Sequence, residues 1–379
     1  MGNTPNIRFK GFTDDWEQRK LNEVAEFNPK SELPDEFEYV DLESVVGTEM
    51  ISHRTETKDS APSRAQRLAQ PGDVFFQTVR PYQKNNYLFS KLDNNYVFST
   101  GYAQMRPNID TAFLMSFLQT DSFVKIVLDN CTGTSYPAIN SSDLSNLEIS
   151  LPKSFEEQKK VGKTIISIDN LITLHQRKCD ETKKLKKFML QKMFPKKDAK
   201  KPEIRFAGFT NDWEQRKLGD WGDFYYGRSC PKWSVTEDAT IPCIRYGELY
   251  TKFGAKIDRV YSYTNMPPEN LRFSKGTEVL IPRVGENPMD YNHCTWLSMK
   301  DVAIGEMISV FNTDNNPLFT ATMFNATLQN EFAMRVEGGS VTNLYFEKLK
   351  NIDVSFPSIR EQEMIAAYFE NIDNLITLH

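Results

Sequence analysis

The alternation of apolar and polar positions predicts short strands mixed with helices. Residues 73–79 (DVFFQTV), 147–151 (LEISL) and 278–282 (EVLIP) are apolar runs bounded by turn-forming residues, which is typical of strands. In residues 113–128 the apolar side chains recur at helical spacing, so we expect one helix there. A much longer helix is expected from Phe155 to about Phe194. The pattern therefore predicts an α+β fold.

The long helix carries an apolar seam that a second helix at the end of the chain repeats. Its members recur at spacings of three and four residues, which favours an antiparallel coiled coil between the two helices. The alternative is a helix packed on its own domain, because His175, Cys179 and Thr182 interrupt the heptad. The expected seam is Ile165, Ile168, Ile172, His175, Phe369, Ile372 and Ile376, with His379 at its end.

The chain is duplicated. Residues 5–21 (PNIRFKGFTDDWEQRKL) return as residues 202–218 (PEIRFAGFTNDWEQRKL), and IDNLITLH occurs at both 168–175 and 372–379. A period near 200 residues is too long for a solenoid, so each repeat is a whole domain. We expect pseudo-twofold-related modules at residues 1–152 and 201–357, a helix with a basic linker at 153–200, and a second helix at 358–379.

Composition narrows the class of protein. No apolar run reaches the ~20 residues of a membrane span, so no membrane contact is expected. The five cysteines form no C-x-x-C pair, which predicts reduced thiols, no metal site and a cytoplasmic protein. Net charge is −5, yet residues 176–201 hold eleven Lys or Arg and three acids. This basic run fits either a nucleic-acid contact or a solvated helix face and linker.

The interiors of the two repeats also match. The segment Gly72-Asp73-Val74 corresponds to residues 276–279 (GTEV), and residues 133–135 (GTS) correspond to 338–340 (GGS). Residues 146–152 (NLEISLP) correspond to 351–357 (NIDVSFP), and each is followed by Glu-Gln and a helix. In this order, twice over, the motifs resemble the specificity subunits of type I restriction-modification systems.

The resemblance covers essentially the whole chain and implies a function. It implies two target-recognition domains that each read one half of a split site in double-stranded DNA, without catalysis and without cofactors. It also implies that the helices dock methyltransferase (modification) subunits and, through them, restriction subunits. The second helix stops at His379 whereas the first continues, so we expect a truncated second helix and an unpaired stretch at residues 182–193. That stretch is expected to bind a modification subunit or a second copy of the chain.

The sequence contains only incomplete versions of two catalytic motifs. Asn287-Pro288-Met289-Asp290 begins like the tetrad of an adenine methyltransferase, but lacks its second proline and its stacking aromatic. Asp35, Glu56 and Lys58 imitate a metal-dependent nuclease, but the second module does not repeat them. The alternative from another class is a scaffold or regulatory remnant that binds modification subunits without reading DNA.

DNA readout requires cations for phosphates and planar amides or guanidinium groups for base edges. Such side chains concentrate just after the strands at 73–79 and 278–282, at matched places in the two modules. A solvated loop is the alternative for each segment. The predicted DNA-binding residues are Arg64, Arg67, Gln77, Arg80, Tyr82, Gln83, Lys84, Asn85, Asn86, Lys252, Arg283, Asn287, Tyr291, Asn292 and His293.

Overall fold

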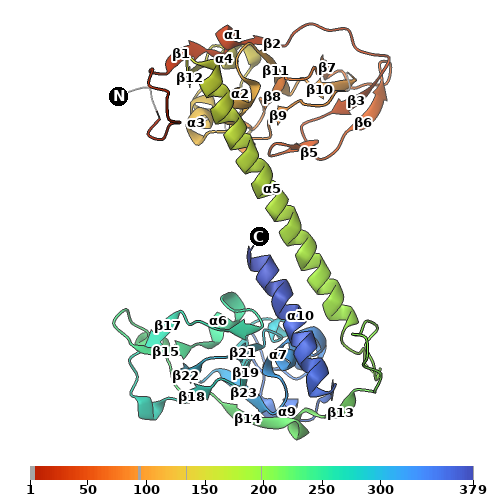
Figure 1. The fold of residues 1–379 in the computed structure, drawn as a ribbon, viewed down its shortest axis with the longest axis vertical. Helices are drawn as coiled ribbons and strands as arrows, with labels where there is room; N and C mark the ends of the chain where they lie inside the picture. Colours follow the sequence, from red (N-terminus) through yellow and green to blue (C-terminus); the bar gives the residue numbers. More distant parts are fainter. Residues whose placement is uncertain (1–4, 93–94, 134, 198, 379) are drawn as a thin grey trace. The chain divides into compact units, whose positions relative to one another are not determined.

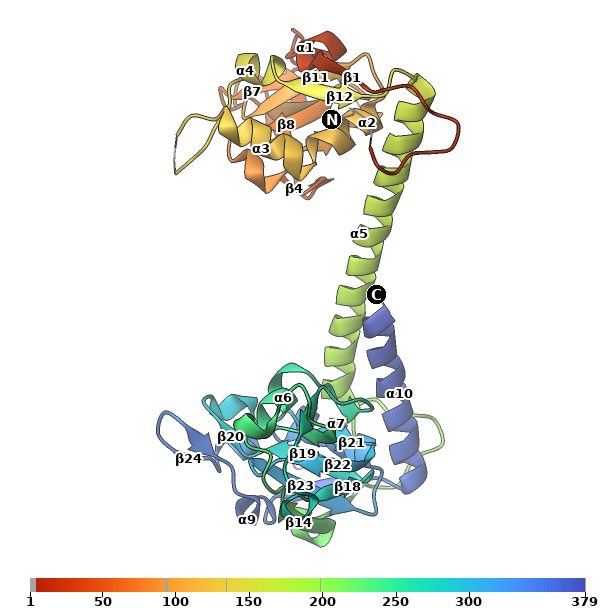
Figure 2. The ribbon, with the colours of Figure 1, turned by 90° about the vertical axis from the view of Figure 1, so that its left-hand side faces the viewer.

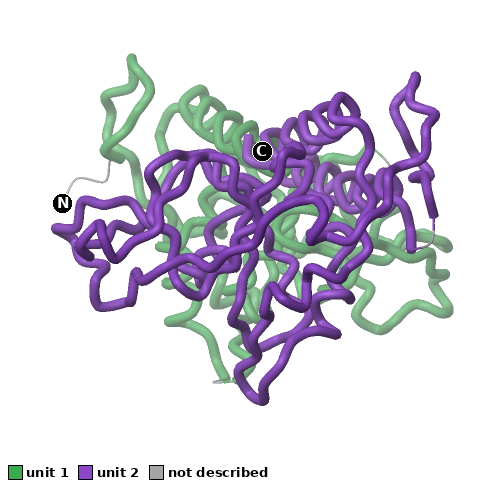
Figure 3. The backbone as a smooth tube through the Cα atoms, turned by 90° about the horizontal axis from the view of Figure 1, so that it is seen from below, with its two compact units in different colours: residues 1–174 green, residues 175–379 purple. Residues whose placement is uncertain are grey.

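The protein, as a computed structural model, divides into two compact units. Unit 1 comprises residues 1–174 and unit 2 residues 175–379 (Figure 3). The structure describes residues 5–92, 95–133, 135–197 and 199–378, so the predicted motif positions Thr134 and His379 lie outside the described residues. Both units combine sheets with helices, which confirms the α+β class. The unit boundary falls within the long helix α5 (Phe155–Lys192), close to the expected span (Figure 1).

Unit 1 is built on two four-stranded sheets. Their strand orders are β6-β3-β10-β7 and β2-β11-β8-β9, and β1 pairs with β12 and β4 with β5. The strands are β1 (Glu17–Lys20), β2 (Ala25–Phe27), β3 (Glu36–Val40), β4 (Val45–Val46), β5 (Glu49–Met50), β6 (Arg54–Thr57), β7 (Ala65–Leu68), β8 (Val74–Gln77), β9 (Tyr87–Leu88), β10 (Tyr96–Ser99), β11 (Tyr102–Pro107) and β12 (Glu148–Leu151). The helices before α5 are α1 (Leu21–Val24), α2 (Thr111–Leu118), α3 (Asp121–Asp129) and α4 (Ser141–Ser145).

Unit 2 has sheets of order β14-β23-β19-β21-β16, β17-β15-β22-β18 and β20-β25-β24, and β13 pairs with β26. The strands are β13 (Glu214–Lys217), β14 (Gly222–Tyr226), β15 (Ile241–Ile244), β16 (Lys256–Ile257), β17 (Ser262–Thr264), β18 (Phe273–Lys275), β19 (Glu278–Pro282), β20 (Val284–Gly285), β21 (Thr295–Leu297), β22 (Lys300–Ile304), β23 (Ile308–Thr313), β24 (Glu337–Gly338), β25 (Thr342–Asn343) and β26 (Asp353–Phe356). The helices are α6 (Tyr246–Thr251), α7 (Pro317–Thr327), α8 (Gln329–Ala333), α9 (Phe346–Leu349) and α10 (Ile359–Leu378).

The two units share the central part of their topology. In each, a four-stranded sheet has a parallel central pair, β3 with β10 in unit 1 and β15 with β22 in unit 2. In each, a strand from the repeated N-terminal segment pairs antiparallel with the strand just before the long helix, so that Glu17 faces Leu151 and Glu214 faces Phe356. The duplication seen in the sequence is therefore a duplication of fold.

Strands β8 and β19 lie at the centre of each unit. Side chains alternate between the two faces of a strand, and both strands are apolar on both faces. In β8, Val74 and Phe76 pack in one hydrophobic cluster and Phe75 packs in another. In β19, Val279 and Ile281 pack in one cluster and Leu280 packs in another. Each strand is thus fixed between two cores, and the loop that follows it starts from a rigid point.

The helix expected over residues 113–128 is wrong in one respect. The structure has two helices there, α2 and α3, and Thr120 caps the second by accepting a hydrogen bond from the Phe123 N–H. Apolar spacing continues across this corner and therefore hides it. Among the described residues no single helix has the length and apolar composition to cross a membrane, although the bent pair of α2 and α3 reaches both when taken together.

An ion pair between a half-buried arginine and a buried glutamate closes each unit. In unit 1 the Arg8 guanidinium donates to both carboxylate oxygens of Glu157 at 2.6 and 2.8 Å. In unit 2 Arg205 donates to both oxygens of Glu361 at 2.7 Å. The hydrogen bonds from Arg8 hold the pKa of Glu157 below its ordinary value. These contacts explain why the N-terminal segment and the Glu-Gln motif occur together in both repeats: the segment is tied to the first turn of the helix.

In unit 2, α10 packs antiparallel on the C-terminal part of α5. The Cys179 Sγ lies 3.8 Å from the Ile376 carbonyl oxygen, Lys186 Nζ donates to Asp373 at 2.5 Å, and the Phe194 ring stacks on Phe369 at 6.0 Å between centroids (Figure 2). Partner numbers fall along α10 as they rise along α5. The expectation that residues 182–193 lack an intramolecular partner is therefore wrong, because Met193 is buried and Met189 packs on the same core.

The matching seam in unit 1 is exposed. Ile165, Ile168 and Ile172 of α5 are 38%, 50% and 51% exposed. Their counterparts in α10 differ, since Phe369 and Ile372 are 1% and 5% exposed and Ile376 packs on the core of unit 2. The predicted seam member His175 is also exposed. One repeat thus covers a helix face that the other repeat leaves open.

Candidate nucleic-acid interface

In unit 1 a basic loop leaves the end of β8. It contains a short 3-10 turn, Pro81–Gln83, between Arg80 and Lys84, which have φ values of 53° and 56°. Such left-handed backbone is strained for residues other than glycine and clusters at functional sites. The Arg80 N–H donates to the Pro137 carbonyl at 2.8 Å, which fixes the loop to a neighbouring segment. The loop is therefore held in one conformation from both sides.

Two predicted DNA-binding residues of this loop point inward. Gln77 and Asn86 are 3% and 1% exposed. The Asn86 side-chain oxygen accepts from the Gln77 backbone N–H at 2.8 Å, and the Gln77 side-chain amide donates to the Val79 carbonyl and to Gln83. These amides build the loop, and their burial removes them from the set of side chains that face solvent.

Other predicted residues of unit 1 remain at the surface. Tyr82 is 49% exposed and Gln83 and Arg64 are exposed, whereas Lys84 donates to Asp121 at 2.5 Å. The Asn85 side-chain oxygen accepts from the Gly47 N–H at 2.8 Å and so ties the β4–β5 hairpin to the loop. Among the described residues, Arg67 has a buried Nε without a hydrogen-bond partner, and this burial lowers its pKa.

The corresponding loop of unit 2 begins at Arg283, directly after β19. Its guanidinium carbon lies 4.7 Å from the Tyr226 ring centroid and 5.6 Å from that of Tyr345. The Arg283 carbonyl accepts from the Leu344 N–H, just as the Thr78 carbonyl accepts from the Ile139 N–H in unit 1. By this pairing the backbone counterpart of Arg283 is Thr78, and Arg80 stands two residues further along. Both arginines therefore follow the central strand of their unit, but they are offset by two residues in the backbone pairing.

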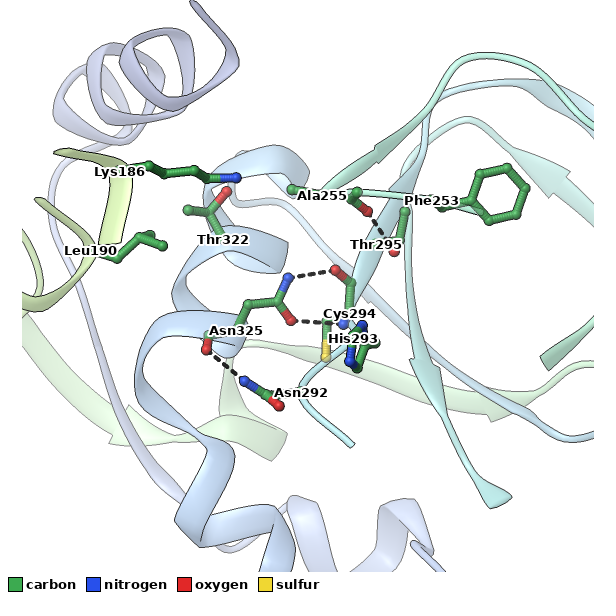
Figure 4. Close-up of a pocket in the computed structure, with 11 residues that line it drawn as sticks. Lys186, Leu190, Phe253, Ala255, Asn292, His293, Cys294, Thr295, Thr322 and Asn325 are labelled. Carbon is green, nitrogen blue, oxygen red and sulfur yellow. Dashed lines mark hydrogen bonds between the residues drawn. The ribbon is translucent and has the colours of Figure 1, made fainter. Parts of the chain in front are cut away.

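The remaining predicted residues of unit 2 lie apart from Arg283. Asn287 is exposed and caps a short turn, whereas Tyr291 is fully buried and its hydroxyl donates to the Thr342 carbonyl at 2.6 Å. Asn292 and His293 line a pocket of about 160 Å³ beside α5 and α7, where the Asn292 amide donates to the Asn325 carbonyl (Figure 4). Lys252, an exposed residue directly after α6, approaches Glu248 and the Tyr261 ring. Tyr291 thus has a structural role: its buried hydroxyl ties the loop after β19 to the segment at Thr342.

The basic linker is largely engaged within unit 2. Lys192 and Lys196 both pair with Glu203, and their hydrogen bonds lower the pKa of Glu203 to about 2. Lys197 approaches Glu331 at 3.8 Å, and Lys200 and Lys201 approach Asp212 at 3.9 and 3.2 Å. Acids compensate this basic run locally, which favours its interpretation as a helix end and linker.

Sequence reasoning missed the tyrosines that contact the two arginines. Tyr136 lies under Arg80 with 4.5 Å between its ring centroid and the guanidinium carbon, and Tyr226 and Tyr345 flank Arg283. The available signal was the repeated glycine motif at residues 133–135 and 338–340. It marks the segments that pair with each arginine loop, and two of the three tyrosines, Tyr136 and Tyr345, lie shortly after it.

The residues of the nuclease-like pattern make ordinary structural contacts. The Glu56 carboxylate accepts from Arg54 Nε at 2.8 Å, and the Asp35 carbonyl accepts from the Lys58 N–H. Across the part of the chain that the structure describes, no group of three or more His, Cys, Asp or Glu residues is placed to hold a metal ion.

The duplicated fold defines a protein with two tandem domains of one kind, each with an arginine in the loop after its central strand. The chain belongs to the family described as type I restriction modification DNA specificity domain, whose family model matches residues 13–184 and 210–379. It is 24% identical to the type I restriction enzyme MjaVIII specificity subunit of Methanocaldococcus jannaschii, over 71% of this chain and 64% of that protein. It is 28% identical to the putative type I restriction enzyme MjaX specificity subunit of the same organism, over 64% of this chain and 56% of that protein.

A solved structure shares the fold. The type I restriction-modification S subunit from M. genitalium superposes with a TM-score of 0.64 at 15% identity, covering 100% of this chain and 93% of that chain. The chain spans about 64% and 56% of the lengths of these two curated relatives.

Proposed function

We propose that this chain is a non-catalytic DNA-binding specificity subunit of a type I restriction-modification complex, acting in the cytoplasm. Unit 1 reads one half of a bipartite target in double-stranded DNA and unit 2 reads the other half. Methylation and cleavage belong to partner subunits, of which the modification subunits bind this chain and the restriction subunits join through them. The proposal rests on family membership together with the arginine loops.

The observation that carries the proposal is the recurrence of one arrangement in two units. Each unit ends a doubly buried central strand in a loop that presents an arginine, and pairs that loop with the segment after the glycine motif. Arginine is the side chain that most often contacts guanine, through two parallel hydrogen bonds in the major groove. Two similar readers in one chain suit a target made of two separate parts.

A selection from random DNA duplexes tests the proposal. The full chain, with and without its modification subunits, is incubated with the library and the bound DNA is sequenced. We expect two short motifs separated by a spacer of fixed length. A chain that retains the modification subunits but enriches no sequence would instead support the scaffold alternative.

The exposed seam of α5 in unit 1 is the proposed docking face for a modification subunit. Its three isoleucines correspond to α10 residues that are covered within unit 2, so this face is an exposed apolar stripe of the kind that a partner covers. A second copy of the chain is the other occupant that a test must distinguish.

Replacing Ile168 and Ile172 together by glutamate is expected to weaken binding of the modification subunits at least about tenfold, because two charges would enter an apolar contact. Asn170→Glu on the opposite, exposed face of α5 is the matched control. Light scattering after size-exclusion chromatography measures the complexes. Loss of a homodimer in the double variant would name a second copy as the occupant, and unchanged assembly would contradict a docking role.

A further inference from the structure

The aromatic rings next to Arg80 and Arg283 have no role in the readout described so far. Tyr136 is 64% exposed, although its ring carries the Arg80 guanidinium on one face. In unit 2, Arg283 lies between Tyr226 and Tyr345, and in the described chain its buried Nε has no hydrogen-bond partner. In each unit the arginine of the loop thus lies against a tyrosine from another segment of the chain.

We propose that Tyr136 in unit 1, and Tyr226 with Tyr345 in unit 2, are positioning residues that fix the plane of the reading guanidinium. This inference rests on the proposed function and deepens it. An arginine side chain has many rotamers, and ordering it on DNA costs conformational entropy. A ring under the planar guanidinium restricts those rotamers before DNA arrives, while the N–H groups at its edge can still form two parallel bonds to guanine. In unit 2 the Arg283 Nη1 also donates to the Glu306 carbonyl at 3.4 Å, a second contact that orders this side chain.

The backbone of unit 1 is shaped to hold Tyr136 in place. Thr132 and Ala138 pair through two hydrogen bonds of 2.9 and 3.0 Å, and they close the short loop that bears the tyrosine. Gly133 has φ +86°, and a Cβ there would lie 3.0 Å from the Tyr136 carbonyl oxygen. Only glycine fits this turn without moving Tyr136. The repeated glycine motif is thereby explained: it shapes the turn that places the tyrosine ring under the arginine.

Unit 2 uses the same kind of turn with another supplier of the ring. Gly338 has φ +125°, and a Cβ there would lie 2.4 Å from the Val341 carbonyl oxygen. Tyr345 follows just after this hairpin, and Tyr226 comes from the end of β14. The Tyr226 hydroxyl donates to Glu347 at 2.9 Å, and burial together with Glu347 raises the pKa of Tyr226 to about 12. Tyr226 is therefore a neutral ring in a fixed orientation.

The rings suit arginine rather than DNA as their first partner. A guanidinium over a tyrosine face is attracted by the ring quadrupole, and the interaction strengthens when water is excluded, as at a protein–DNA interface. The half-buried Arg80 and the left-handed backbone that carries it leave the guanidinium on the ring instead of extended into solvent. Removing the ring while keeping the charge should therefore loosen selectivity more than affinity.

The test compares Tyr136→Phe with Tyr136→Leu in the full chain, using selection from random DNA duplexes. Base preference at the positions that depend on Arg80 is expected to fall about 3- to 20-fold in Tyr136→Leu, and to stay within about twofold in Tyr136→Phe. The salt dependence of binding should not change in either variant, because the number of charges is unchanged. Tyr345→Leu should act in the same way on the other half of the target.

A double variant separates positioning from direct contact. If Tyr136 acts through Arg80, Tyr136→Leu adds nothing to Arg80→Ala. A further loss in the double variant, or a loss in Tyr136→Phe equal to that in Tyr136→Leu, would overturn the inference, since the tyrosine would then contact DNA itself. No change in Tyr136→Leu while Arg80→Ala flattens the preference would overturn it and leave the proposed function intact. No effect of Arg80→Ala would refute Arg80 as a reader.

Discussion

Replacing Glu361 by glutamine is expected to destabilise unit 2 by about 3 kcal/mol, because the change leaves the Arg205 guanidinium buried without its charged partner. The Arg205 and Glu361 side chains are 13% and 1% exposed, and two hydrogen bonds join them. The pair also ties the repeated N-terminal segment to the first turn of α10. Its loss should therefore release both the segment and the helix.

Urea unfolding followed by tryptophan fluorescence measures this effect, because four of the five tryptophans, at positions 213, 221, 233 and 296, lie in unit 2. Glu363→Gln is the matched control: it removes the same charge from the same helix turn at an exposed position. Equal shifts of the midpoint in the two variants would show that the ion pair contributes nothing beyond the charge at the helix start.

Arg80→Ala and Arg283→Ala are each expected to flatten base preference in one half of the DNA target and leave the other half unchanged. The loss should amount to about 1–3 kcal/mol per arginine if each makes paired hydrogen bonds to a base. Sequencing of duplexes selected from a random library gives the preference at every position. Both changes should act without unfolding, since both loops are anchored through backbone hydrogen bonds.

Arg19→Ala and Arg216→Ala provide controls matched in charge. They occupy equivalent positions of the repeated segment, on strands β1 and β13, and both side chains are exposed. These controls should leave the selected motifs unchanged. If Arg80→Ala weakened binding to all sequences equally, with a smaller salt dependence, the residue would contact a phosphate instead of a base.

Periodicity and repetition were sufficient to predict much of the fold. The span of α5, the strand β19 and the duplication of domains follow from local apolar patterns and from matched sequence, which depend little on distant contacts. The corner between α2 and α3 was missed because apolar spacing runs through it. The pairing of α10 was misjudged because the partners run antiparallel: Ile376 lies beside Cys179 and Phe369 beside Phe194, so α10 covers the C-terminal part of α5.

Composition pointed to the loops after β8 and β19 as candidate sites, but it did not show which of their side chains face solvent. Arg80 and Arg283 are half-buried, whereas Gln77, Asn86 and Tyr291, which were predicted with them, face inward. Burial of an amide depends on hydrogen bonds such as that between Gln77 and Asn86, which no local pattern reveals. The tyrosine platforms come from segments distant in sequence, so only the fold brings them to the arginines.

The pairing of β1 with β12, and of β13 with β26, brings the start and the end of each domain together. Residue 17 faces residue 151, and residue 214 faces residue 356, so the chain enters and leaves each domain at adjacent points. The segments at residues 5–21 and 202–218, which begin the two domains, are nearly identical, and the helices α5 and α10 that follow the domains begin alike. The two domains are therefore bounded by matching sequence. A single recombination between these repeats can therefore exchange the sequence of one domain while the two long helices stay as they were.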